Sequence, residues 1–192
     1  MAQEQIKNIK LIIIGGSSGS LEVIMKILPK LKKDFSIPVV IIMHRNTVSD
    51  SALTELLASR TFLTVKEAED KDQLEPGSIY IAPPDYHLLI EADGTISLDA
   101  SERVHYSRPS IDVSFMSAAV AYKNEGVAIL LSGANADGAE GIKAIKDCGG
   151  YTIVQDPDEA SVGYMPQQAL LTKAVDEILS GERMGDWLNA LS

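Results

Sequence analysis

The sequence predicts an α/β fold: a doubly wound, mainly parallel sheet with helices on both faces and an antiparallel hairpin at one edge. Short apolar runs bounded by turn residues alternate along the chain with segments of helical periodicity. The runs show little polar alternation, which is typical of parallel strands covered on both faces. Ala92-Asp93-Gly94 separates two short strand-like runs, and this pattern favours a hairpin.

Runs rich in apolar or β-branched residues are predicted as strands. Pro83-Pro84 stops the run at Ala82, because proline lacks the amide that a central strand needs. In chain order, the predicted strands are Lys10–Ile14, Pro38–His44, Thr64–Glu67, Ser78–Ala82, His87–Glu91, Thr95–Leu98, Val127–Ser132 and Tyr151–Gln155.

Helical periodicity predicts the segments between the strands. Pro29 interrupts or ends the first helix, and Ser49 or Asp50 caps the second, since a short side-chain oxygen accepts from the free amides of a first turn. Pro109-Ser110 starts the third helix, and Gly149-Gly150 ends the fourth. The predicted helices are Leu21–Leu31, the segment through Ser59, Ile111–Tyr122, Asp137–Asp147, Gln167–Leu171 and Glu182–Leu191.

Length and composition favour one domain over residues 1–192, with its core at about 9–179. The chain has 192 residues, 45% hydrophobic and 23% charged, and no linker or repeat. No apolar run is long enough to span a bilayer, and the N-terminus lacks the apolar block of a signal peptide. We therefore expect a cytoplasmic protein without membrane insertion. The one cysteine, Cys148, suits a reducing compartment and is expected to be a small buried residue.

The net charge of −10 excludes free nucleic acid as an expected partner, because binding it normally needs a basic surface. A dinucleotide fingerprint is incomplete, since Ile14 stands where its first glycine belongs. His44-Arg45 replaces the acidic residue that would bind the ribose, although Arg45 leaves an NADP site as a weak alternative. No Gly-Lys-Ser/Thr follows the first strand, so a Walker A loop is absent.

Reactive side chains follow three predicted strands: Ser17-Ser18, His44-Arg45 and the loop ending at Asp137. Ligands bind at the carboxyl ends of strands in open parallel sheets, so we expect these residues to meet. A serine becomes a nucleophile when a histidine removes its proton, and a carboxylate orients that histidine. The stretch Gly15–Gly19 also matches G-x-S-x-G, a sharp turn that exposes a serine. The sequence therefore favours a Ser17–His44–Asp137 triad for acyl transfer.

Plainer interpretations stay open for each residue. Ser17 would cap a helix or bind phosphate, His44 would be a packed structural histidine, and Asp137 would only cap the next helix. His87 and His105 are expected to face solvent in or near the hairpin.

The chain resembles the catalytic domain of the chemotaxis protein-glutamate methylesterases, the CheB type, over nearly its whole length. The stretches that carry the resemblance are IIIGGSSGS, VVIIMHR, GSIYIAPPDYHLLI, SRPSIDVSFMSAA, GVAILLSGANADGAEGIKAIKDCGG and TIVQDPDEASVGYMPQQAL.

The resemblance implies a serine hydrolase that removes methyl groups from glutamyl esters on the cytoplasmic helices of chemoreceptors and possesses, in some members, glutamine deamidase activity. The family nucleophile falls on Ser17, its base on His44 and its orienting carboxylate on Asp137. Ser18, next to the nucleophile, would help to orient His44 or support the oxyanion, and backbone amides near His44 and Ala134 would be the oxyanion donors. No metal or organic cofactor is implied.

The chain also departs from the family pattern. Ser20 and the Ala134–Ala136 loop replace typical glycines and a methionine, and Arg45 adds a positive charge that would meet receptor carboxylates. Fewer than ten residues precede the first strand, so we expect no receiver domain, and control by a separate response-regulator receiver is an alternative. A non-catalytic receptor-binding or signalling module on the same fold is the competing hypothesis.

Overall fold

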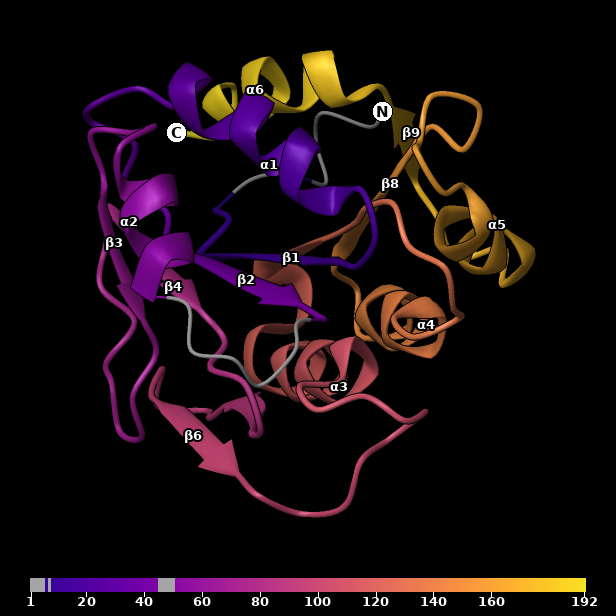
Figure 1. The fold of residues 1–192 in the computed structure, drawn as a ribbon, viewed down its shortest axis with the longest axis horizontal. Helices are drawn as coiled ribbons and strands as arrows, with labels where there is room; N and C mark the ends of the chain where they lie inside the picture. Colours follow the sequence, from indigo (N-terminus) through magenta and orange to yellow (C-terminus); the bar gives the residue numbers. More distant parts are fainter. Residues whose placement is uncertain (1–5, 7, 45–50) are drawn as a thin grey trace.

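The computed structural model describes residue 6, residues 8–44 and residues 51–192. Within them, a seven-stranded sheet is parallel throughout, and a separate two-stranded sheet is antiparallel. The order across the large sheet is β3 (Thr64–Glu67), β4 (Ser78–Ile81), β2 (Val39–Met43), β1 (Leu11–Gly16), β7 (Gly126–Leu130), β8 (Tyr151–Gln155) and β9 (Glu177–Leu179). Figure 1 shows β1 near the middle of the molecule.

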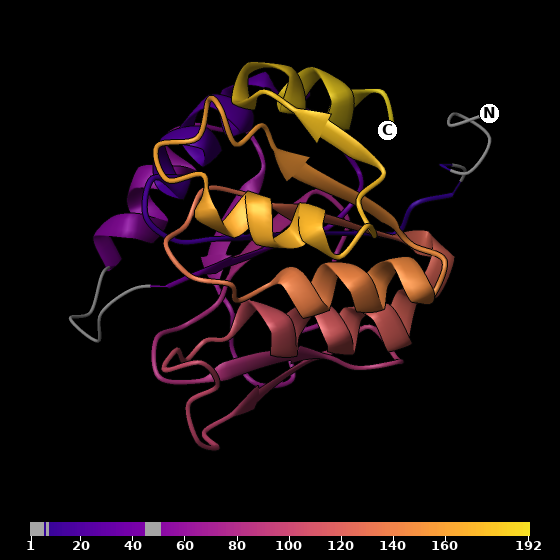
Figure 2. The same cartoon turned by 90° about the vertical axis from the view of Figure 1, so that its right-hand side faces the viewer.

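Helices cover both faces of the sheet, as Figures 1 and 2 show. One face carries α1 (Ser20–Ile27), the 3₁₀ turn η2 (Leu28–Lys30), α2 (Ser51–Ala58) and α6 (Gly181–Asn189). The other carries α3 (Ile111–Tyr122), the 3₁₀ turn η3 (Lys123–Glu125), α4 (Ala139–Asp147) and α5 (Tyr164–Leu171). The predicted fold class is confirmed.

The central strand β1 divides the apolar interior into two cores. Ile12 and Ile14 pack against the α1 and α6 side, whereas Leu11 and Ile13 pack against the α3 and α4 side. Successive side chains of a strand point to opposite faces, so an unbroken apolar run serves both cores. This burial on both faces explains why the strand sequences lack polar alternation.

The hairpin of β5 (His87–Ile90) and β6 (Ile96–Asp99) is present, but it does not extend an edge of the large sheet. It packs on α3 instead, where Ser114 Oγ donates to the Leu88 carbonyl at 2.7 Å and the Ile90 amide donates to Ser117 Oγ at 2.9 Å. The predicted edge position was wrong, because helix hydroxyls satisfy backbone groups of β5 in place of an edge strand.

Most predicted elements lie within a few residues of their observed bounds. The first helix gives way to a 3₁₀ turn at Pro29, and α5 begins at Tyr164 rather than Gln167. The short strand β9 was missed. Cys148 is exposed, so its predicted burial was wrong, because it follows the last turn of an amphipathic helix on the outer side.

The predicted caps Ser49 and Asp50, and Arg45 as well, lie outside the described residues. No helix in the described part is long and apolar enough to cross a membrane.

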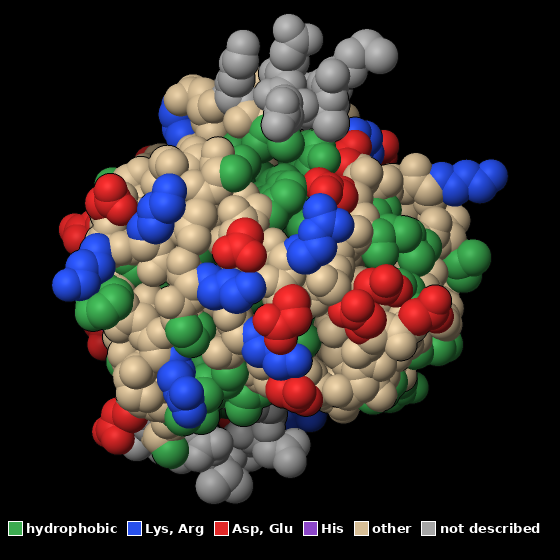
Figure 3. All heavy atoms as spheres, turned by 90° about the horizontal axis from the view of Figure 1, so that it is seen from above, with side chains coloured by type: hydrophobic (Ala, Val, Ile, Leu, Met, Phe, Trp, Pro, Cys, Tyr) green, Lys and Arg blue, Asp and Glu red, His purple; other side chains and the backbone are tan. Residues whose placement is uncertain are grey.

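Acidic and basic side chains are interspersed on the face over α1 and α6 (Figure 3). Ion pairs join these two helices with η2, including Lys26 with Glu182 at 3.4 Å and Lys30 with Asp186 at 3.2 Å. This face therefore offers no single-sign patch to a charged partner.

Candidate active site

The carboxyl ends of β1, β2 and β7 bring together the segments that the sequence singled out. Gly16 pairs with Met43, so the next residues, Ser17 and His44, leave neighbouring strands side by side. The His44 amide donates to the Gly16 carbonyl at 3.2 Å and continues this ladder. The strand order reverses at β1, between β2 and β7, which is where open α/β sheets bind ligands.

His44 and Asp137 are in direct contact. His44 Nε2 lies 2.7 Å from Asp137 Oδ2, and the side chains are 13% and 0% exposed. An ionised carboxylate only accepts hydrogen bonds, so the proton between them belongs to Nε2. The neutral ring then has an unprotonated Nδ1, which is the nitrogen left to act as a base.

Asp137 is held by the amino-terminal end of α3. Its Oδ1 accepts from Ser110 Oγ and the Asp112 amide, both at 2.9 Å, and its Oδ2 accepts from the Ile111 amide at 2.7 Å. Burial opposes ionisation, but the hydrogen bonds from His44 and the two amides outweigh it and hold the pKa of Asp137 below its ordinary value. Asp137 does cap a helix, but that helix is α3 and not the α4 that follows it.

Hydrogen bonds hold the backbone of Ser17 at both its amide and its carbonyl. The Ser17 amide donates to the Ser132 carbonyl at 2.9 Å, and the Ser17 carbonyl accepts from Ser20 Oγ at 2.7 Å. Gly19 has φ +85°, and a Cβ there would lie 2.6 Å from Ser161 Cβ, so glycine allows this sharp entry into α1. Ser17 is partly exposed and Ser18 exposed. Within the described residues, no hydrogen bond joins Ser17 Oγ to His44.

Several backbone amides near Ser17 have no acceptor. Among the described residues, the amides of Ser18, Gly19 and Ala134 donate to no protein group. The His44 amide, in contrast, is already bound to Gly16. Of the predicted oxyanion supports, Ser18 and Ala134 therefore have free donors, and those of Ser18 and Gly19 lie at the positive end of the α1 dipole.

Ser132, which no sequence motif singles out, joins the turn to a neighbouring loop. Its hydroxyl donates to the Ser18 carbonyl at 2.6 Å and accepts from the Val162 amide at 2.9 Å. The Gly133 amide donates to the Val162 carbonyl at 3.0 Å. One buried hydroxyl thus couples residues 17–19 to the loop before α5.

A second histidine, which is buried, supports Asp137 indirectly. His87 is 1% exposed, its Nδ1 accepts from the Ser110 amide at 3.1 Å, and its Nε2 lies 2.9 Å from the Glu102 carbonyl. The expectation that His87 faces solvent was wrong, because both ring nitrogens have backbone hydrogen-bond partners, which offsets the cost of burying the polar ring. His105, as expected, is exposed, at 65%.

His87, Ser110 and Asp137 have the composition of a triad but not its geometry. Ser110 Oγ donates to the carboxylate of Asp137, and His87 accepts from the backbone amide of Ser110 rather than from its hydroxyl. Ser110 is 0% exposed, so a substrate has no access to its hydroxyl. This cluster is a support for Asp137 and not a nucleophilic centre.

Comparison with known proteins finds a matching family. The model of the CheB methylesterase family matches residues 12–188. The chain belongs to the CheB methylesterase family. A Leptospira interrogans relative, whose name gives it provisionally as a protein-glutamate methylesterase/protein-glutamine glutaminase, is 43% identical over 179 residues, which are 93% of each chain.

Solved and curated members of the CheB family extend the match. The crystal structure of the Thermotoga maritima CheB methylesterase catalytic domain has a TM-score of 0.91 and 34% identity, covering 96% of this chain and 99% of that one. A Carboxydothermus hydrogenoformans protein-glutamate methylesterase/protein-glutamine glutaminase is 38% identical over 88% of this chain. The match covers 52% of that relative, so this chain spans about half its length.

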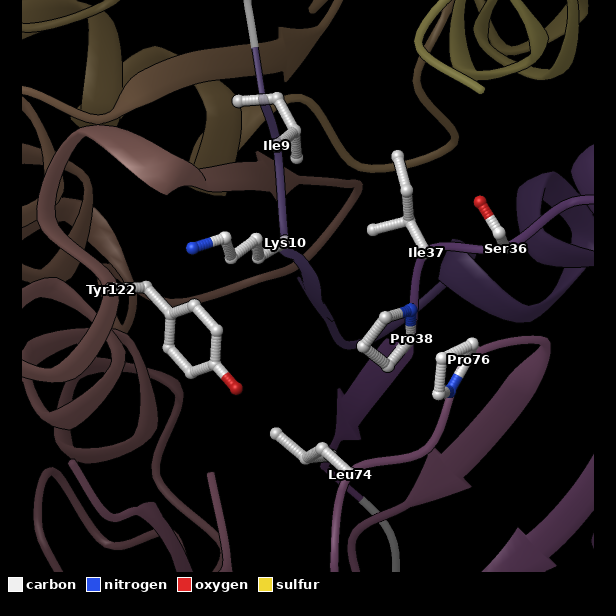
Figure 4. A pocket seen from close by; sticks show the side chains of 8 residues that line it. All are labelled: Ile9, Lys10, Ser36, Ile37, Pro38, Leu74, Pro76 and Tyr122. Atoms are coloured by element: carbon white, nitrogen blue, oxygen red, sulfur yellow. The ribbon is translucent and has the colours of Figure 1, made fainter. Parts of the chain in front are cut away.

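A pocket of about 290 Å³ lies at the opposite end of the sheet from the candidate active site. Lys10 and Pro38, which directly precede β1 and β2, line it together with Leu74 and Tyr122 (Figure 4). His44 and Asp137 follow the carboxyl ends of β2 and β7, so the pocket does not belong to the candidate active site.

Proposed function

We propose that this chain is a serine hydrolase that demethylates glutamyl methyl esters of chemoreceptors through Ser17, His44 and Asp137. The observation that carries the proposal is the 2.7 Å contact between His44 and Asp137, beside the strand end that bears Ser17. Membership of the CheB methylesterase family supports the same substrate class. Relatives named protein-glutamate methylesterase/protein-glutamine glutaminase support deamidation of protein glutamines as a second reaction.

The reaction divides into two acyl transfers. Ser17 Oγ attacks the ester carbonyl carbon while His44 Nδ1 takes the serine proton. The oxyanion accepts from the free amides of Ser18 and Ala134, and the proton then passes from His44 to the departing methoxide, which leaves as methanol. Water, deprotonated by His44, attacks the acyl-serine and releases the glutamate. Asp137 stays ionised and stabilises the imidazolium.

The missing Ser17–His44 hydrogen bond is compatible with this role. Catalytic hydrogen bonds are often long or misaligned without substrate and tighten when it binds. His44 and Ser17 leave adjacent strands in register, so their side chains start from neighbouring positions, and we expect the bond to form when substrate binds.

Methanol release from methylated receptor membranes tests the proposal. Ser17→Ala should abolish release and keep the melting temperature, because the Ser17 hydroxyl makes no hydrogen bond within the described residues. Ser36→Ala is the matched control, since Ser36 is exposed at the other end of the sheet. Wild-type release by folded Ser17→Ala would remove Ser17 as nucleophile.

A fluorophosphonate probe separates this proposal from a non-catalytic module on the same fold. An activated serine reacts quickly with the probe, whereas a binding module does not. One domain over residues 1–192, a cytoplasmic location and control by a separate receiver protein stay predictions.

A further inference from the structure

The buried carboxylates of Asp112 and Asp137 each accept hydrogen bonds from the first turn of the helix beside the other residue. Asp112, in the first turn of α3, accepts at Oδ1 from the Gly138 amide at 2.9 Å and the Gly141 amide at 2.7 Å, both at the start of α4. Asp137, directly before α4, accepts in return from the Ile111 and Asp112 amides of α3. Each acid therefore satisfies free amides of the other helix.

This exchange sets the position of Asp137. Gly138 directly follows Asp137, so the bond from its amide to Asp112 holds the peptide that carries the Asp137 side chain. Gly138 has φ +98°, and a Cβ there would lie 2.5 Å from Leu130 Cδ1, so the segment has no room to shift in that direction. α3 and α4 are also close, since a Cβ on Gly141 would lie 2.5 Å from Phe115 Cβ.

We propose that Asp112 is a positioning residue for the esterase reaction, because its hold on Gly138 and Gly141 keeps Asp137 Oδ2 against His44 Nε2. The inference rests on the proposed function. Asp112 is 4% exposed and acts through Asp137, so it has no contact with substrate. Among the described residues, His105 Nε2 faces its other carboxylate oxygen, at 3.9 Å from Asp112 Oδ2.

The variants Asp112→Asn and Asp112→Ala separate this positioning role from a general loss of stability. Asp112→Asn keeps an Oδ1 that accepts from both amides, whereas Asp112→Ala leaves two buried amides without an acceptor. We expect Asp112→Ala to lower kcat about 10- to 100-fold, as small misplacements of catalytic groups do, with KM unchanged. Asp112→Asn should restore kcat to within a few-fold of wild type.

A second measurement does not depend on activity. The proton between His44 Nε2 and Asp137 should give a downfield proton NMR signal, identified by its loss in Asp137→Asn. The signal should weaken or shift in Asp112→Ala and persist in Asp112→Asn. If wild type shows the signal but no methanol release, the proposed function fails while the positioning role stands.

Asp176→Ala is the matched control. Asp176 also accepts from a backbone amide, that of Thr152 at 3.0 Å, but it lies at the amino end of β9, away from the site. We expect it to lower the melting temperature and to leave kcat and the NMR signal unchanged.

The proposal is overturned if folded Asp112→Ala keeps wild-type kcat and signal, if Asp112→Asn is as impaired as Asp112→Ala, or if Asp176→Ala loses equal kcat at equal loss of stability. Should Asp112→Ala not fold, Asp112→Ser takes its place, since its shorter side chain leaves at least one amide unbound and the same loss of kcat is expected.

Discussion

His44 Nε2 lies 2.7 Å from Asp137 Oδ2, although 93 residues separate the two along the chain. The contact fixes which edge of the imidazole faces the carboxylate. In the serine-protease template the carboxylate binds Nδ1 and Nε2 is the base, whereas here the carboxylate faces Nε2, so the proposed function assigns the role of base to Nδ1. The same chemistry needs only that one nitrogen is held and the other is free.

Asp137→Asn should lower kcat by about 10³- to 10⁴-fold with little change in KM. An amide NH₂ facing Nε2 favours the tautomer with its proton on Nδ1, which cannot accept the proton of Ser17. Single-turnover kinetics on methylated receptor check the result. A loss below ten-fold would show that Asp137 does not orient the base.

Ser110→Ala should leave probe labelling at Ser17 and lower stability by about 1 kcal/mol, because it removes the bond to Asp137 Oδ1 and the side-chain cap of α3. Fluorophosphonate labelling and denaturant unfolding measure both effects. Ser17→Ala is the comparison and should lose all labelling. If labelling disappeared in folded Ser110→Ala and persisted in Ser17→Ala, Ser110 and not Ser17 would be the nucleophile.

Gly141→Ala should destabilise the fold by about 1–3 kcal/mol and lower kcat, since the added methyl group forces α3 and α4 apart at Phe115. Glu140→Ala is the control, because Glu140 is the exposed neighbour on the same helix. Thermal unfolding and methanol release are measured for both. Equal behaviour of the two variants would contradict close contact between the helices.

The difference in unfolding free energy between wild type and Asp112→Asn should depend on pH. Burial, together with the charge of Asp137, raises the pKa of Asp112 from 3.8 to about 6, although the amides of Gly141 and Gly138 oppose the rise. Between pH 3.8 and about pH 6, Asp112 is protonated in the native state and ionised in the unfolded chain. Lowering the pH through this range therefore stabilises the native state of the wild type through Asp112. The gain is complete below about pH 4 and is lost as pH rises through about 6.

Denaturant unfolding at pH 7.5 and pH 5 measures this difference. Wild type should gain stability relative to Asp112→Asn at pH 5. The lowered pKa of Asp137 acts in the opposite direction, but its stabilisation is lost only as pH falls below the ordinary carboxyl range, so the windows are separate. A pH-independent difference would show that Asp112 titrates as it does in the unfolded chain.

Local patterns were enough to predict most of the elements. The runs at β1, β2 and β7 are apolar throughout, and burial on both faces requires that pattern. β9 was missed because a three-residue strand carries no periodicity. The hairpin was predicted, but its place on α3 was not, since its hydrogen bonds to Ser114 and Ser117 join segments that are distant along the chain.

The sequence by itself determined that Ser17, His44 and Asp137 follow strands of one parallel sheet, because strand ends are encoded by short-range patterns of apolar and turn residues. Only the tertiary structure decided that Nε2 of His44 meets Asp137, that His87 is buried, and that Asp112 and Asp137 cap each other's helices. These are contacts between segments distant along the chain. Their hydrogen bonds depend on how α3 and α4 pack, which no local pattern specifies.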